Sequence, residues 1–114
     1  GRSLKYFRCR HEPDGVTVAT QKGSIRRVKS YGANVFQNWI QGLARDCFAH
    51  CLREIKKAGF RVVLHVHDEV VVEVEEAYAE EAMSAIQKLM SQPPEWMKSV
   101  PLEAEAFITE EYCK

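Results

Sequence analysis

Polar and apolar residues alternate along residues 61–75, and this alternation predicts two strands joined by a tight turn. Valine or leucine fills the even positions on both sides of the turn, while charged residues and histidine fill most odd positions. A strand with this pattern can bury one face and expose the other to water. The segment is therefore expected to be a hairpin with one apolar face, and His67, Asp68 and Glu69 occupy its turn.

Two longer segments repeat apolar residues at three-residue and four-residue steps, which is the spacing of an amphipathic helix. The first predicted helix covers residues 34–58 and is followed by Gly59, a common stop residue. Its apolar stripe comprises Phe36, Ile40, Leu43, Cys47, Cys51 and Ile55. The second predicted helix covers residues 77–91 and is ended by Pro93 and Pro94, which cannot continue a helix.

Short strands are predicted near both ends of the chain. Residues 1–30 read as a small antiparallel meander, with strands over 16–19 and 24–28 and a Pro-Asp-Gly turn at 13–15. Residues 102–109 alternate again and predict a final strand. This order of elements predicts an α+β fold, in which two helices pack on one face of an antiparallel sheet.

The composition is that of an ordinary globular domain, with 46% hydrophobic and 28% charged residues in a chain of 114. No apolar run is long enough to span a bilayer, and the basic start lacks the apolar core of a signal peptide. A soluble, cytoplasmic protein without a membrane partner is expected. Because the cysteines show no paired CxxC spacing, they are expected to be reduced thiols, with a zinc site as the lesser alternative.

Charge is distributed unevenly along a chain whose formal net charge is zero. Residues 1–30 carry eight Lys or Arg against two acids, whereas residues 68–111 carry twelve acids against two lysines. The basic segment also contains Tyr6 and Phe7, and such a mixture is typical of a surface that lies along nucleic acid. The acidic segment is interpreted more simply as the solvated face of a helix and a strand.

The predicted hairpin turn is unusual because it carries two adjacent carboxylates, Asp68 and Glu69, in place of Asn-Gly or Asp-Gly. Carboxylate oxygens held on rigid strands are suited to binding magnesium. The residues alone leave three interpretations open. The turn is a solvated loop, half of a two-metal phosphoryl-transfer site, or a hydrolase site with His65, His67 and Asp68 as transition-metal ligands.

Several segments resemble the family A DNA polymerases, the bacterial polymerase I type. Val-His-Asp-Glu-Val-Val at 66–71 resembles motif C of that family. Tyr-Gly at 31–32, continuing to Gln41 and to Ala-Arg-Asp at 44–46, is similar to a helix of the phage enzymes. Gly-Arg-Ser at the start and Pro-Leu-Glu-Ala-Glu near the end resemble flanking segments of the same family. The resemblance covers essentially all of 1–114 and implies a single C-terminal palm segment, a partial palm subdomain, of a phage-like polymerase.

In the complete enzyme, this resemblance implies template-directed nucleotidyl transfer, the reaction of DNA replication, supported by two Mg²⁺ ions. It implies that Asp68 is a metal-binding and catalytic aspartate of the palm. Glu69 is implied to be the auxiliary metal-binding and catalytic carboxylate beside it. His67 is implied to be a catalytic residue that lies by the primer terminus.

The same resemblance implies contacts with the primer–template DNA. Gln41 is expected to test base pairing by a hydrogen bond in the minor groove, where the acceptors are alike for all pairs. Arg45 is expected to support the DNA cleft, and Arg2 and Lys5 are expected DNA contacts in the basic first segment.

Parts of such an enzyme have no counterpart in this chain. Nothing resembles motif A, whose aspartate completes the metal pair, or the fingers helix that binds the incoming deoxynucleotide, or the thumb. Asn34 and Gln37 also depart from the basic residue and the Glu that many relatives carry. The isolated chain is expected to be inactive, with the missing motif A, fingers and thumb portion as its partner. The alternatives are a nucleic-acid-binding module of a split polymerase and a prophage remnant, and the uncovered face could self-associate.

Overall fold

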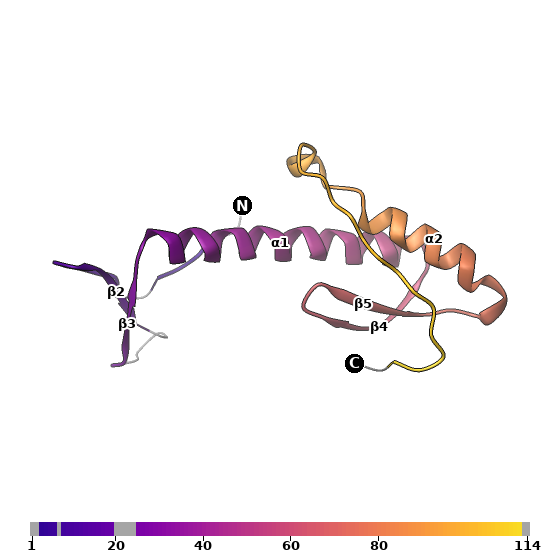
Figure 1. Ribbon diagram of the computed structural model, residues 1–114, viewed down its shortest axis with the longest axis horizontal. Coiled ribbons are helices and arrows are strands. Elements are labelled where there is room, and N and C mark those ends of the chain that lie inside the picture. Colours follow the sequence, from indigo (N-terminus) through magenta and orange to yellow (C-terminus); the bar gives the residue numbers. More distant parts are fainter. Residues whose placement is uncertain (1–2, 7, 20–24, 113–114) are drawn as a thin grey trace. The chain divides into compact units, whose positions relative to one another are not determined.

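Figure 1 shows the computed structural model of the chain, which describes residues 3–6, 8–19 and 25–112. The α+β class is confirmed, since the described residues contain two antiparallel sheets and two α-helices. The strands are β1 (Arg10–Glu12), β2 (Gly15–Ala19), β3 (Arg27–Ser30), β4 (Arg61–Val66) and β5 (Glu69–Glu73). The helices are α1 (Gly32–Lys57) and α2 (Ala79–Met90), with 3₁₀ turns at Glu76–Tyr78 and Glu95–Met97. The chain divides into two compact units, Gly1–Ala44 and Arg45–Lys114.

In the first unit, β1, β2 and β3 form an antiparallel meander in that order. Glu12 pairs with Gly15, so Pro13 and Asp14 form the turn that the sequence predicts. Val18 pairs with Val28, and opposed residues in an antiparallel pair share a face of the sheet. One face of this small sheet is therefore apolar.

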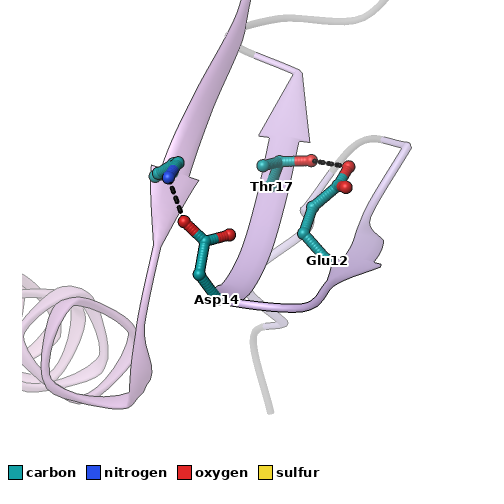
Figure 2. A network of polar contacts seen from close by, with 4 residues as sticks. Glu12, Asp14 and Thr17 are labelled. Carbon is teal, nitrogen blue, oxygen red and sulfur yellow. Dashed lines mark hydrogen bonds and ion pairs between the residues drawn. The ribbon is translucent and has the colours of Figure 1, made fainter.

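The other face of the same sheet carries a polar network (Figure 2). Thr17 Oγ1 donates to Glu12 Oε1 at 3.3 Å, and Lys29 forms an ion pair with Asp14. Arg27 donates from Nη2 to the carbonyl oxygen of Thr17 at 2.8 Å and from Nε to its hydroxyl at 3.0 Å. Exposed ion pairs such as Lys29–Asp14 contribute little stability. The two hydrogen bonds from the Arg27 guanidinium to Thr17 join β3 to β2 and favour their register. Two basic residues of the first segment are thus already engaged within the sheet.

Helix α1 begins at Gly32, two residues before the predicted start, and its end has an identifiable cause. Gly59 has a φ of 91°, in the left-handed region that favours glycine. Its N–H donates to the carbonyl of Lys56 at 3.1 Å, and the N–H of Phe60 donates to the carbonyl of Ile55 at 3.3 Å. This pair of bonds is the Schellman motif, and it satisfies carbonyl groups that a helix end leaves open.

The core of the second unit lies between the C-terminal half of α1, α2 and the β4–β5 hairpin. Ile55 is fully buried, and Cys47, Phe48 and Cys51 are buried on the same side of α1. The Sγ of Cys51 donates to the carbonyl of Met90 at 3.7 Å, which links α1 to the end of α2. In Figure 1 the C-terminal end of α1 and helix α2 lie on the same side of the hairpin.

The thiols of this core are free and behave as apolar side chains. Burial raises the pKa of the Cys51 thiol to about 11, with the neighbouring Cys47 adding to the effect. Burial likewise raises the pKa of Cys47. Both groups therefore stay protonated near neutral pH, which is unfavourable for metal binding by thiolates.

Two features of the expected architecture are wrong. The described strands form two separate sheets, where one sheet was expected. Residues 102–109, all of which the structure describes, form no strand. Gln87 Nε2 donates to the carbonyl of Ala104 at 2.8 Å, so a helix side chain holds this segment where a strand partner was expected. The strand predicted over 24–28 begins outside the described residues, and β3 starts at Arg27.

Among the described residues, no helix has the length and the apolar character needed to cross a membrane.

Candidate functional site

The candidate site is the two-residue turn between β4 and β5. Val66 pairs with Glu69, which leaves His67 and Asp68 at the tip. His67 has a φ of 53°, and tight hairpin turns require a positive φ at their first central residue to match the strand twist. Histidine tolerates this region better than most residues other than glycine. The turn exposes Asp68, while Glu69 is half-buried at the start of β5.

A bulge in β4 changes which residues share a face with the site. Val62 pairs with Val72, but Leu64 pairs with Val71, so Val63 is an extra residue in β4. Beyond the bulge, even positions of β4 oppose odd positions of β5. The even positions of the two strands were predicted to share one apolar face. Because of the bulge, they no longer share a face between Leu64 and the turn. The bulge accounts for the two valines at odd positions, because Val63 is the extra residue and Val71 becomes the partner of Leu64.

Helix α1 contacts the hairpin through Arg45 and Phe48. The guanidinium carbon of Arg45 lies 5.6 Å from the centre of the Phe48 ring, within the range of a cation–π contact. Arg45 Nη1 also donates to the carbonyl oxygen of His67 at 3.5 Å, the long end of hydrogen-bond distances. The ring of Phe48 meets the ring of His65 edge-on, with centroids 6.2 Å apart. These contacts connect the turn to a helix of the same unit.

The C-terminal segment reaches the same turn. Burial first, and then the charge and side-chain hydrogen bond of Glu69, raise the pKa of Tyr112. Tyr112 and Glu69 therefore lie close to one another. Sequence reasoning missed this contact, because nothing local connects residues 43 positions apart.

Asp68 and Glu69 supply carboxylate oxygens, the ligand type that magnesium prefers. No group of three or more His, Cys, Asp or Glu among the described residues could hold a metal ion. These two carboxylates therefore fit as part of a ligand set, to be completed by groups beyond the described residues or by water. His65 lies against Phe48, so the hydrolase alternative with His65, His67 and Asp68 is not assembled within the described part of the chain.

A polar stripe runs along α1 beside its apolar stripe, turned from it by about 100° around the helix axis. Asn34, Gln37, Gln41 and Arg45 recur at three-residue and four-residue steps, so they share one face of the helix. Gln41 and Arg45 are exposed. The sequence interpretation singled out Gln41, and the same spacing rule identifies the wider polar face.

The model of the DNA polymerase family A matches residues 18–114. The chain belongs to DNA polymerase family A. It is 34% identical to the DNA polymerase of Bacillus phage SP02 over an alignment of 122 positions, gaps included. The alignment covers 100% of this chain and 18% of that protein. It is 31% identical to the thermostable DNA polymerase I of Thermus filiformis, with 96% of this chain and 13% of that protein covered.

A third family A relative is the chloroplastic DNA polymerase I A of Oryza sativa subsp. japonica, 32% identical, with 82% of this chain and 8% of that protein covered. The chain spans less than a fifth of the length of these curated polymerases. No solved structure gives a match. The family assignment made from the residues is thus confirmed, and the roles of single residues stay predictions.

For this family A chain, the structure brings some of the predicted site residues together. His67 and Asp68 form the turn, Glu69 follows as the first residue of β5, and Arg45 contacts the backbone of the turn. Gln41 belongs to the first unit by its position on α1. Lys5 is exposed and outside any strand or helix, and Arg2 lies outside the described residues.

The backbone of the turn predicts an order of stability among variants of His67. Val at this position should be about 1–2 kcal/mol less stable than Gly, because a β-branched side chain clashes with the backbone at positive φ. The glycine variant should retain the stability of the parent chain to within about 1 kcal/mol. Chemical denaturation of His67→Gly and His67→Val measures the difference, and equal stability of the two would contradict the left-handed turn.

Proposed function

We propose that this chain is the part of a family A DNA polymerase that presents the metal-binding aspartate, Asp68, at the site of DNA synthesis. The observation that carries the proposal is the strained two-residue turn that exposes Asp68 beside Glu69. Strained backbone at a polar turn is often retained for function. The match to the family supports the same assignment.

In the proposed reaction, the primer 3′ hydroxyl attacks the α-phosphate of a deoxynucleotide, a new phosphodiester bond forms and pyrophosphate leaves. Two Mg²⁺ ions, when bound, would supply positive charge at the attacking and leaving oxygens. Asp68 would hold metal through its exposed carboxylate. Glu69, which lies near Tyr112, would complete the acidic side of the site, and His67 would lie at the primer terminus.

The polar face of α1 would contact the primer–template duplex. Gln41 would donate to the minor-groove acceptors, purine N3 and pyrimidine O2, which occur in every correct pair. Such a contact reports correct geometry without reading the sequence. Arg45 would hold the turn that carries Asp68 through its bond to the carbonyl of His67. Lys5 and Arg2 would contact phosphate groups, which position DNA without specifying sequence.

The remaining parts of the site would come from polypeptide that this chain does not contain. These parts are the second aspartate in motif A, the fingers that bind the deoxynucleotide, and the thumb. The basic first segment, with eight Lys or Arg among residues 1–30, favours a second candidate function, that of a nucleic-acid-binding partner module in a polymerase made of separate pieces. Both functions require Asp68 to act together with a larger assembly.

A chimera tests the proposed function. In it, this chain replaces the matching region of the SP02 phage DNA polymerase. The chimera should extend a primed template, whereas the isolated chain should not, because it lacks a nucleotide site and the second aspartate. Extension is followed on a gel with a labelled primer, and the phage polymerase with the region deleted is the background control. Extension by the isolated chain, or a folded chimera with only background activity, would refute the proposal.

A further inference from the structure

The apolar stripe of α1 is buried at one end of the helix and exposed at the other. Cys47 and Ile55 are 6% and 0% exposed. Further toward the start of the helix, Phe36, Trp39 and Ile40 are 61%, 52% and 44% exposed. A stripe of this kind is normally buried over its whole length, since burial of apolar surface stabilises the helix.

The exposed end of the stripe borders a groove in the first unit. The groove has a volume of about 680 Å³ and lies where the apolar face of the β1–β3 sheet meets the start of α1. Its lining is largely apolar and aromatic, and includes Val16, Val18, Tyr31, Val35, Phe36 and Trp39. A contiguous apolar surface with large aromatic residues is typical of a site that binds another polypeptide.

DNA is a poor occupant for this groove. Contacts with DNA are made mostly to phosphate groups by cationic and polar side chains. The groove lining contains no Lys or Arg among the described residues. Lys29 is the register partner of Thr17, and Arg27 donates a hydrogen bond to the same residue. Val16 and Val18 lie on the opposite face of that strand. The proposed DNA contact Gln41 lies on the polar face of α1, about 100° around the helix from Ile40.

The length of the related polymerases indicates what could fill the groove. The phage polymerase has more than four-fifths of its length outside the region that matches this chain. We propose that this groove and the adjoining face of α1 form the docking site for an apolar segment of the polymerase polypeptide outside residues 1–114. The proposal rests on the proposed function. Helix α1 would then hold DNA on its polar face and protein on its apolar face, so docking would fix the position of Gln41.

Hydrogen exchange measured by mass spectrometry tests the docking site, with the free chain compared to the chimera. Amides of residues 35–43 should exchange at least about tenfold more slowly in the chimera, because docking suppresses local opening of the helix. Residues 47–55 include the buried Cys47, Phe48, Cys51 and Ile55 and serve as the internal control. Trp39→Glu in the chimera should return residues 35–43 toward the rate of the free chain. Gln37→Glu, which adds the same charge on the polar face, should not.

A second measurement keeps the test decisive if the chimera does not fold. The free chain is added to the SP02 polymerase lacking its matching region, and the matching region of that polymerase itself serves as the positive control. Trp39→Glu should weaken binding by about tenfold or more, and Gln37→Glu by less than about twofold. No binding by this chain beside a positive control, or equal loss in both variants, would overturn the proposal. Self-association of the free chain that Trp39→Glu abolishes would also overturn it, because a second copy would then occupy the groove.

The docking site and the proposed function fail separately. Protection of residues 35–43 without primer extension would support the docking site and refute the proposed function. Primer extension with an unprotected α1 would support the polymerase and remove the docking site.

Discussion

Replacing Asp68 by alanine in the chimera is expected to abolish primer extension while the protein stays folded. Without the Asp68 carboxylate, the proposed Mg²⁺ ions would be held poorly. The positive charge of such ions stabilises the transition state by several kcal/mol, so the variant should incorporate nucleotides about a thousandfold more slowly or worse. Asp68 is exposed at the turn, so its removal creates no cavity. The rate of single-nucleotide incorporation at saturating deoxynucleotide measures the effect.

Glu73→Gln is the matched control for this experiment. It removes a carboxylate from the same hairpin, but Glu73 pairs with Arg61 at 2.9 Å at the opposite end of the two strands. Its effect on the rate should stay within about tenfold, since an exposed ion pair contributes little. Primer–template binding should survive in both variants, because the expected DNA contacts lie elsewhere. A comparable loss of rate in both variants would show that the total negative charge of the hairpin matters and that Asp68 has no special role.

Local patterns in the sequence predicted the elements well because their causes are local. The alternation at 61–75 and the three-to-four spacing at 34–58 correspond to the hairpin and to α1. The turn was also located correctly, although Glu69 is the first residue of β5 and only His67 and Asp68 form the tip. The candidate site at these three consecutive residues is therefore visible before any tertiary contact is known.

Long-range pairing could not be predicted in the same way. Alternation at 102–109 shows that a strand is possible, but a strand also needs a partner edge. Gln87 binds this segment through the carbonyl of Ala104. The bulge at Val63 was hidden for the same reason, because only the register with β5 reveals an extra residue. The contact of Tyr112 with Glu69 likewise depends on the course of the chain beyond α2.

Phe48→Ala is expected to lower the free energy of unfolding of the second unit by about 3–5 kcal/mol, the usual cost of removing a buried aromatic ring. Phe48 is 8% exposed and contacts both the Arg45 guanidinium and the His65 ring. Urea denaturation of the isolated chain, followed by circular dichroism, measures the change. Phe36→Ala is the control on the same helix, and because Phe36 is 61% exposed its cost should stay below about 1 kcal/mol.

Phe48→Ala should destabilise the region around the turn more than the rest of the second unit. Phe48 is the residue through which α1 meets β4, and Arg45 stacks on the same ring while it holds the carbonyl of His67. Its removal should therefore speed hydrogen exchange in β4, whose His65 ring meets the Phe48 ring, more than in α2. Equal acceleration in both elements would mean that Phe48 stabilises the unit as a whole. A selective effect in β4 would mean that α1 sets the position of the turn that carries Asp68.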